Sequence, residues 1–412
     1  MNPLQVTNPF RPGAGHVPPY LAGRDSEKKE FLKLLSQKPI LSNLVLTGLR
    51  GVGKTVLLEE LKPMANKEKW WWVGTDMSES SSVNEETLAR RLLADLSVAT
   101  SGISIEDTIK PIGFAMLPTQ KEKTLTYSTL LDLYGSANGL AADRLKYVLE
   151  FVWEYVSRLG IKGIVFAYDE AQTMSDHAEK DQYPLSILLD MFQSIQRKGI
   201  PFMLVMVGLP TLFPRLVEAR TFAERMFNVQ ILNKLNPVES RAAITKPILQ
   251  SKSPIKFNQG TVNLVIETSG GYPYFIQFLC KEIFDVFLQQ LATDGKLQSF
   301  PLDGIIKKLD KDFFAGRWAR ATDRQRQLLS IIAHLENCDE EFSVLDIVTG
   351  AKSTRQPFSP SHVNQMLGNL SNAGLIYKNR HGRYAFAVPL LGQFIRRQEK
   401  EEQQLKLPFE GQ

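Results

Sequence analysis

The stretch Gly48-Leu49-Arg50-Gly51-Val52-Gly53-Lys54-Thr55 constrains the fold of this chain more than any other part of its sequence. It fits the pattern G-x-x-x-x-G-K-[S/T], and it stands between an apolar run that predicts a strand and a pattern that predicts a helix. The glycines let backbone N–H groups point at phosphate oxygens, and the helix N-terminus adds the positive end of its dipole. The stretch therefore predicts a phosphate-binding loop inside an α/β domain.

Each polar residue of this loop has an expected role. Lys54 would reach the β- and γ-phosphates and assist catalysis, and the hydroxyl of Thr55 would bind Mg²⁺. A glycine turn without a ligand is the alternative, and the strand-to-helix context argues against it. The expected ligands are ATP or ADP with Mg²⁺. The predicted nucleotide-binding residues of the loop are Gly48, Gly51, Val52, Gly53, Lys54, Thr55 and Val56.

Two carboxylates, Asp169 and Glu170, close the apolar run at 164–168. Burying an unpaired carboxylate is costly, so a strand that ends this way is expected to open onto a cation or a solvated site. Asp169 fits a direct or water-mediated Mg²⁺ ligand, and Glu170 fits the base that deprotonates an attacking water. An acidic exit from the strand is the alternative. A water-activating glutamate favours ATP hydrolysis over transfer of phosphate to a metabolite.

After a predicted helix from about Glu27 to Leu35, short apolar runs alternate with helical patterns to about Leu235. Because the runs contain few polar residues, they predict strands buried on both faces, and hence a parallel sheet flanked by helices. The expected organisation is an arm at 1–20, a nucleotide-binding core at 21–235 with an insertion at about 78–159, a helical lid at 236–318, a further domain at 319–398 and a flexible tail at 399–412. The insertion could serve as a partner-binding surface or as a structural cover.

These features resemble the AAA+ ATPases, in the branch shared by archaeal and bacterial ATPases of the origin-recognition and signal-transduction (STAND) type. The resemblance covers most of residues 15–398 and rests on "YLAGRD", "TGLRGVGKT", "FAYDEAQ", "VGLPTL", "ARTFAERMF" and "GGYPYFIQFL". It implies a five-stranded parallel sheet in the order 5-1-4-3-2, an α-helical lid and a C-terminal winged helix. It also implies an ATPase that acts as an assembly switch.

The resemblance implies further nucleotide contacts. Gly23 and Arg24 would lie beside the adenine, and Tyr272 and Pro273 would approach the nucleotide from the lid. The loop at 208–210 lacks the polar residue that many members of the family place there, which indicates slow hydrolysis.

An arginine that completes a neighbouring subunit's site is also implied, so a homo-oligomer is expected in the ATP-bound state. Arg225 is the predicted residue, and Arg220 is an alternative for the same role. A solvated arginine paired with Glu218 or Glu224 is the other interpretation.

Positive charge is concentrated near the C-terminus. Between Ala351 and Gln398 the chain has seven Lys or Arg residues and no Asp or Glu. We expect Ser361 to cap a helix whose polar face offers residues that can bind bases or phosphates, followed by a cationic wing. This pattern predicts contact with duplex DNA, mainly through phosphates. The predicted DNA-binding residues are His362, Asn364, Lys378, Arg380 and Arg383.

Two alternatives to this DNA-binding switch remain. In a STAND-like signalling or antiphage-defence ATPase, the winged helix would be a packing or autoinhibitory module and the output would be a protein partner. A small-molecule kinase is disfavoured by Glu170 and the lid.

The C-terminal residues Gln404, Leu405, Leu407 and Phe409 resemble the Q-L-x-L-P-[LF] peptide that binds the bacterial sliding clamp. Gln404 would form hydrogen bonds at the pocket rim while the apolar side chains fill the pocket. A tail that folds back onto its own body is the alternative.

Composition sets broader limits. The formal net charge of +5 is too small to imply nucleic-acid binding by itself, and the two cysteines have no neighbours at metal-ligand spacing. No segment has the apolar length of a membrane span. We expect a cytoplasmic protein without membrane contact.

Overall fold

The computed structural model describes residues 6–13, 15–108, 120–293, 295–353 and 357–406. The chain forms two compact units. The sheet unit contains Arg24–Gly48 and Lys54–Ile231, and the helical unit contains the residues up to Gly23, the short segment Leu49–Gly53 and the chain from Leu232 onward.

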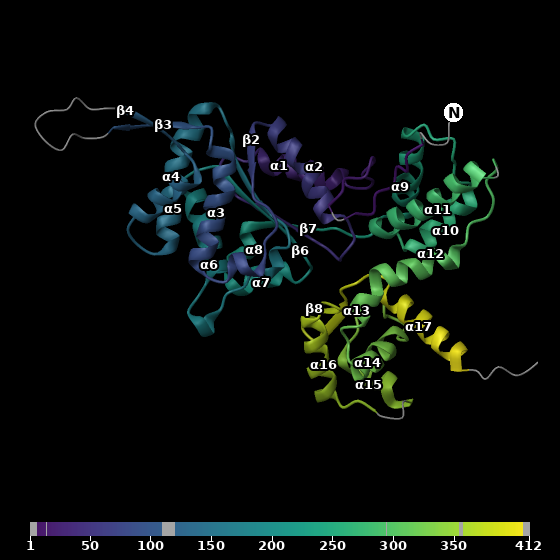
Figure 1. The fold of residues 1–412 in the computed structure, drawn as a ribbon. Helices are drawn as coiled ribbons and strands as arrows, with labels where there is room; N and C mark the ends of the chain where they lie inside the picture. Colours follow the sequence, from purple (N-terminus) through teal and green to yellow (C-terminus); the bar gives the residue numbers. More distant parts are fainter. Residues whose placement is uncertain (1–5, 14, 109–119, 294, 354–356, 407–412) are drawn as a thin grey trace, which may run out of the picture. The chain divides into compact units, whose positions relative to one another are not determined.

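The sheet unit is built on a parallel five-stranded sheet (Figure 1). Its strands lie in the order β2-β5-β6-β1-β7, which confirms the order expected from the family resemblance. The register places Val45 beside Met206 on one side and Val229 on the other. The strands are β1 (Asn43–Thr47), β2 (Trp70–Val73), β5 (Gly163–Tyr168), β6 (Phe202–Gly208) and β7 (Phe227–Ile231).

Helices cover both faces of this sheet, which explains why β5 and β6 are buried at every residue. On one face, Phe166 packs with Phe192 of α6 at a ring distance of 5.2 Å. On the other face, Trp72 meets Phe31 of α1 at 6.1 Å. The helices of the unit are α1 (Asp25–Leu35), α2 (Lys54–Lys67), α3 (Glu85–Thr100), α4 (Tyr127–Ser136), α5 (Ala141–Val156), α6 (Pro184–Arg197), α7 (Leu212–Ala219) and α8 (Ala223–Met226).

The expected insertion at about 78–159 contains α3, α4, α5 and an antiparallel pair of strands, β3 (Ser104–Thr108) and β4 (Gln120–Thr124). Helices α3 and α5 bury their apolar faces in the same core as β5 and β6, since Leu92 and Val148 are fully buried there. Helices α3 and α5 therefore pack on the sheet. The choice between a structural cover and a partner-binding surface stays a prediction.

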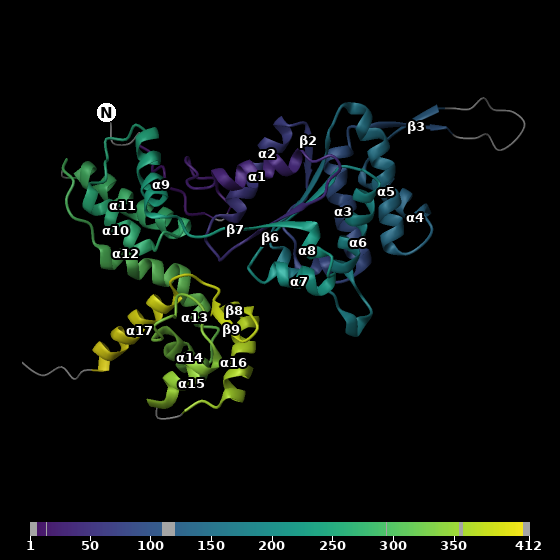
Figure 2. The same cartoon turned by 180° about the vertical axis from the view of Figure 1, so that it is seen from behind.

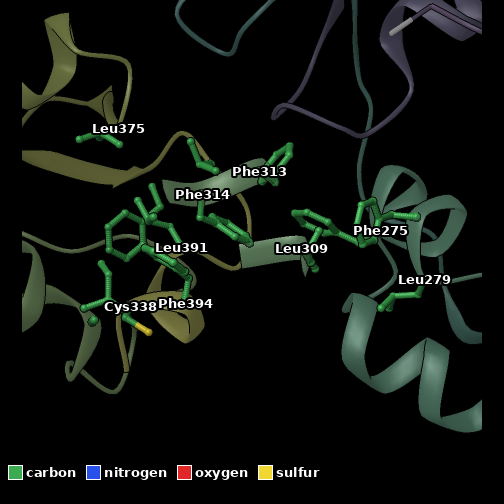
Figure 3. Packing of buried hydrophobic residues seen from close by; sticks show 14 of the residues in the cluster. Phe275, Leu279, Leu309, Phe313, Phe314, Cys338, Leu375, Leu391 and Phe394 are labelled. Carbon is green, nitrogen blue, oxygen red and sulfur yellow. The ribbon is translucent and has the colours of Figure 1, made fainter. Parts of the chain in front are cut away.

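The helical unit begins with four helices that correspond to the expected lid. A π-helical segment, Asp310–Ala315, continues from the fourth of them into the short helix α13. Its residues Phe313 and Phe314 lie between α11 and the C-terminal helix (Figure 3). Phe314 stacks on Phe394 at a ring distance of 5.0 Å. The helices are α9 (Pro237–Gln250), α10 (Gln259–Ser269), α11 (Pro273–Thr293), α12 (Leu302–Leu309) and α13 (Gly316–Trp318).

Three helices, a two-stranded hairpin and a terminal helix complete the helical unit (Figure 2). Ser359, and not the expected Ser361, caps α16: the Ser359 hydroxyl accepts the His362 N–H because Pro360 occupies the first helical position. The elements are α14 (Asp323–Ala333), α15 (Val344–Gly350), α16 (Pro360–Asn372), β8 (Ile376–Arg380), β9 (Arg383–Phe386) and α17 (Leu391–Lys406).

The described part of the N-terminal arm is fixed to α11. Phe10 is buried and lies 6.2 Å from Phe284. The side chain of Asn8 donates to the carbonyl of Lys281 at 2.9 Å and to the carboxylate of Asp285 at 2.7 Å. Residues 6–20 have no helix or strand in their described part, as expected for an extended arm.

Candidate nucleotide site

The predicted phosphate loop connects β1 to α2, in the position that the motif requires. Within the sheet unit, Lys54 Nζ donates to the Gly48 carbonyl at 2.9 Å, which links the two ends of the loop. Within the helical unit, the Tyr274 N–H donates to the Gly51 carbonyl at 3.1 Å. Gly51 has a φ of +77°, and an added Cβ would lie 3.0 Å from the Cβ of Tyr274. A side chain at Gly51 would therefore strain the backbone and crowd Tyr274.

Thr55 and Asp169 are brought together by the sheet order, which places the ends of β1 and β5 at the same edge. The Thr55 hydroxyl donates to Asp169 Oδ2 at 2.5 Å. The other carboxylate oxygen of Asp169 accepts the N–H of Glu170 at 2.7 Å. The structure thus pairs the two residues predicted to bind Mg²⁺.

Asp169 is buried, with 3% of its surface exposed. Burial raises the pKa of its carboxyl, while the hydrogen bond from Thr55 acts in the opposite direction. A nearby cation would offset the free-energy cost of burying the ionised carboxylate. Mg²⁺ prefers oxygen ligands such as a hydroxyl and a carboxylate. The described residues contain no group of three or more His, Cys, Asp or Glu side chains arranged for a metal. If Mg²⁺ binds here, water molecules and phosphate oxygens would complete its coordination.

Glu170 follows the buried strand but is itself exposed. Its φ of +50° lies in the left-handed region, which costs of the order of 1–3 kcal/mol for a residue with a side chain. Such strain is frequent at functional sites. The conformation separates the two neighbouring carboxylates, because Asp169 is buried beside Thr55 while Glu170 faces solvent.

Gln172 is a site residue that the sequence analysis did not single out. Its amide donates to the Glu170 carboxylate, and its carbonyl oxygen Oε1 accepts the Leu209 N–H at 3.0 Å. Arg215 donates to the backbone carbonyl of Gln172 at 2.5 Å. Gln172 therefore joins the predicted base to the loop after β6, which lacks the polar residue that many members of the resembled family place there. The motif "DEAQ" contains this signal, since Gln172 lies two positions after Glu170.

The expected adenine residues lie at the start of α1. Arg24 is buried, and its guanidinium lies 3.5 Å from the Glu27 carboxylate. Gly23 has a φ of +64°, and an added Cβ would collide with the carboxylate of Glu239. Tyr272 and Pro273 lie at the start of α11, and burial raises the pKa of the Tyr272 hydroxyl. Their roles in adenine and lid contacts stay predictions.

The two candidate arginines for a neighbouring site have different surroundings. Arg220 forms an ion pair with Asp190 at 2.7 Å and donates to the Ser186 hydroxyl at 2.7 Å. Arg225 lies in α8 and is exposed. Among the described residues neither arginine pairs with Glu218 or Glu224. Arg220 serves the fold of its own chain, so Arg225 is the better placed of the two for a contact with another subunit.

Three of the seven C-terminal cations, Arg380, Arg383 and Arg397, pair with carboxylates that lie outside residues 351–398. Arg380 pairs with Glu341 at 2.8 Å. Arg383 lies 3.5 Å from the Asp346 carboxylate. The stretch is therefore less positive in space than in sequence.

The predicted DNA-binding helix presents an uncharged polar face. His362 and Asn364 of α16 are exposed, and so is Lys378 of β8.

Gln404 and Leu405 lie in α17, which extends beyond the expected start of a flexible tail. The expected clamp-binding residues Leu407 and Phe409 lie outside the described residues.

This sheet order, with a phosphate loop after β1 and an acidic pair after β5, defines the AAA+ ATPase fold. Residues 42–216 match the family described as AAA domain. Residues 311–395 match a domain of unknown function, DUF8462. No curated protein sequence matches the chain.

Solved structures agree with this assignment of the fold. A Walker-type ATPase of Pyrococcus abyssi is 14% identical, with a TM-score of 0.56 over 91% of this chain and 96% of that one. The ORC2 protein of Aeropyrum pernix in its ADP form is 13% identical, with a TM-score of 0.54 over 96% of this chain and 97% of that one. At these identities the likeness establishes the fold alone. None of the helices described here has the length and apolar character that a bilayer span requires.

Proposed function

We propose that this chain is a cytoplasmic ATP-binding and ATP-hydrolysing AAA+ switch, whose nucleotide state controls its assembly and its binding to DNA. The observation that carries the proposal is the 2.5 Å hydrogen bond between Thr55 and Asp169, with Glu170 beside it. A hydroxyl at the start of the loop helix and a buried carboxylate are the oxygen ligands that nucleotide-bound Mg²⁺ takes in this class of site.

In the proposed reaction, Thr55 and Asp169 hold the metal and Lys54 places its ammonium against the phosphates. Bound Mg²⁺ supplies positive charge that offsets the charge on the phosphate oxygens. Glu170 accepts a proton from water while the water oxygen forms a bond to the γ-phosphorus and the bond to the β–γ bridging oxygen breaks. The products are ADP and phosphate. Gln172 positions the Glu170 carboxylate through its amide.

The test is a Glu170→Gln variant. We expect it to bind ATP with wild-type affinity by calorimetry and to release phosphate about 10²–10⁴-fold more slowly, which is the usual contribution of a general base. Glu179→Gln removes an exposed glutamate outside the site and is the matched control. Normal hydrolysis by Glu170→Gln would contradict the assignment of the base.

Assembly is proposed to use Arg225 from a neighbouring subunit. Arg225→Ala should then lose turnover but bind ATP, and a mixture with Glu170→Gln should recover part of the activity, because some interfaces would combine an intact base with an intact arginine. If the mixture stays inactive, Arg225 does not act across an interface.

The DNA partner is proposed to bind residues 319–398 as a winged helix. Exposed His362, Asn364 and Lys378 support this proposal, together with the absence of acidic side chains on α16. Replacing Lys378, Arg380 and Arg383 with Ala should weaken duplex binding and flatten its dependence on salt. A variant lacking Arg158, Lys162 and Lys198 removes three exposed cations from the sheet unit and is the control. Equal binding by both variants would remove the wing from the proposal.

A STAND-like ATPase with a protein partner is the second candidate, and one observation favours it. A Cβ on Gly374, which follows α16, would lie 3.6 Å from Nη2 of Arg50 in the phosphate loop. The C-terminal region thus touches the loop that would sense nucleotide. DNA binding that depends on nucleotide supports the first candidate; assembly that ignores DNA and follows a protein ligand supports the second.

A sliding clamp is proposed as a further partner through Gln404, Leu405, Leu407 and Phe409. A pull-down with purified clamp, comparing the full chain with a chain that ends at Gln403, tests this directly. Equal recovery of both chains would exclude the peptide.

A further inference from the structure

Three arginines gather where the helical unit holds the phosphate-loop segment Leu49–Gly53. Tyr274 contacts this segment through its hydrogen bond to Gly51, and its ring lies 4.9 Å from that of Phe313. The guanidinium of Arg317 lies over the Phe313 ring at 4.4 Å. Arg50 comes from the segment itself, and Arg320 lies in the turn after α13, where its N–H donates to the Arg317 carbonyl at 3.1 Å.

Among the described residues, none of these three arginines forms an ion pair with a carboxylate. Nε of Arg50 is buried and has no hydrogen-bond partner among the described residues. Arg317 donates to the Phe313 carbonyl, which is a neutral group.

The cations also interact with one another. Burial lowers the pKa of the Arg317 guanidinium, and the charges of Arg50 and Arg320 lower it further, while Tyr274 acts in the opposite direction. Guanidinium groups that are close together and partly buried repel one another, and an anion bound between them relieves this repulsion. By contrast, Arg326 lies 3.6 Å from the Asp323 carboxylate on the next helix, so unpaired arginines are not the rule in this region.

We propose that Arg50, Arg317 and Arg320 form a binding site for a phosphate group. Guanidinium groups match the oxygens of phosphate and carboxylate groups through paired N–H donors. Because Arg50 belongs to the phosphate-loop motif, phosphate is the anion expected at this place. The phosphate has two sources that rest on the proposed function: the bound nucleotide and the backbone of DNA. In either case the ligand ties the phosphate loop to α13, immediately before the C-terminal region.

The test compares an Arg317→Gln/Arg320→Gln variant with wild type, using a slowly hydrolysed ATP analogue in one arm and a short DNA duplex in the other. Binding in the affected arm should weaken at least about tenfold, since hydrogen bonds to charged groups are lost. Lys307→Gln/Lys308→Gln removes two exposed cations that pair with Glu401 and Glu282, and it is the matched control.

The arms distinguish the sources. Weaker binding of the analogue alone assigns the nucleotide, while weaker duplex binding with a flatter salt dependence assigns the DNA backbone. Wild-type affinity in both arms overturns the site. Arg320→Gln alone changes an exposed residue, so it keeps the test valid if the double variant does not fold. Arg320→Lys should recover part of the lost affinity. Failure of the proposed function looks different, because wild type itself would then bind no ATP.

Discussion

Asp310 and Arg397 form a two-point ion pair in which Nη2 and Nε of the arginine lie 2.5 and 2.8 Å from the two carboxylate oxygens. Asp310 begins the π-helical segment, and Arg397 lies in α17. The pair therefore fixes the last helix to the π-helical segment that follows α12. It also neutralises one of the seven cations in the stretch between Ala351 and Gln398, which contains no acidic residue.

Asp310→Asn should loosen α17. The amide keeps the shape of the carboxylate but loses its charge, and a hydrogen bond to a charged group contributes about 1.5–3 kcal/mol. Because Arg397 is about a third exposed, we expect the lower part of this range. Hydrogen exchange of the α17 amides should become faster, and Arg397→Gln should add little to it. Fully additive effects would contradict a direct coupling.

The sheet and the main site residues are predictable from sequence because their signals are local. The phosphate-loop motif, the apolar strands and the acidic pair each occupy a few consecutive residues, and the sheet order then brings Thr55 to Asp169. The ion pairs of Arg380, Arg383 and Arg397 are not predictable in this way. Their carboxylate partners lie outside residues 351–398 and come close to the arginines only in the folded chain.

Asp169→Asn should make the ligand-free chain more stable and remove the stabilisation that Mg²⁺ adds with ATP. Since burial raises the pKa of Asp169, its ionised form is less favourable in the folded chain than in the unfolded chain. Without nucleotide and Mg²⁺, its contribution to stability is full below the ordinary aspartate pKa of about 3.9 and is lost as pH rises through the raised value. Asn has no such loss, so the variant should gain stability relative to wild type across this window.

Urea unfolding of both chains at several pH values measures this difference, and Asp132→Asn, at an exposed aspartate, is the control. The same Asp169→Asn variant should lose the stabilisation that Mg²⁺ adds in the presence of ATP. A stability difference that does not change with pH would contradict burial as the cause.

Gln172→Ala should slow ATP turnover without changing ATP affinity. The Gln172 amide holds Glu170 and the Leu209 backbone in one arrangement, so its loss frees the carboxylate to leave the productive position. We expect a decrease in kcat of about tenfold to a hundredfold, with an unchanged KM, since misplacement of catalytic groups has effects of this size. Gln193→Ala, at a half-exposed glutamine of α6, is the control. A change in KM alone would assign Gln172 to substrate binding.

Asn43→Ala should destabilise the sheet unit because it removes buried hydrogen bonds, chiefly the one that the Leu204 N–H donates. Asn43 is fully buried at the start of β1, where its Oδ1 accepts the Leu204 N–H at 2.7 Å and the Gln196 amide at 2.8 Å. Removing the side chain leaves the Leu204 N–H buried without a partner, which costs about 1–3 kcal/mol. The midpoint of urea unfolding should fall by the corresponding amount, while Asn66→Ala, at an exposed position of α2, should leave it unchanged. An unchanged midpoint for Asn43→Ala would mean that water or a neighbouring group satisfies the Leu204 N–H in its place.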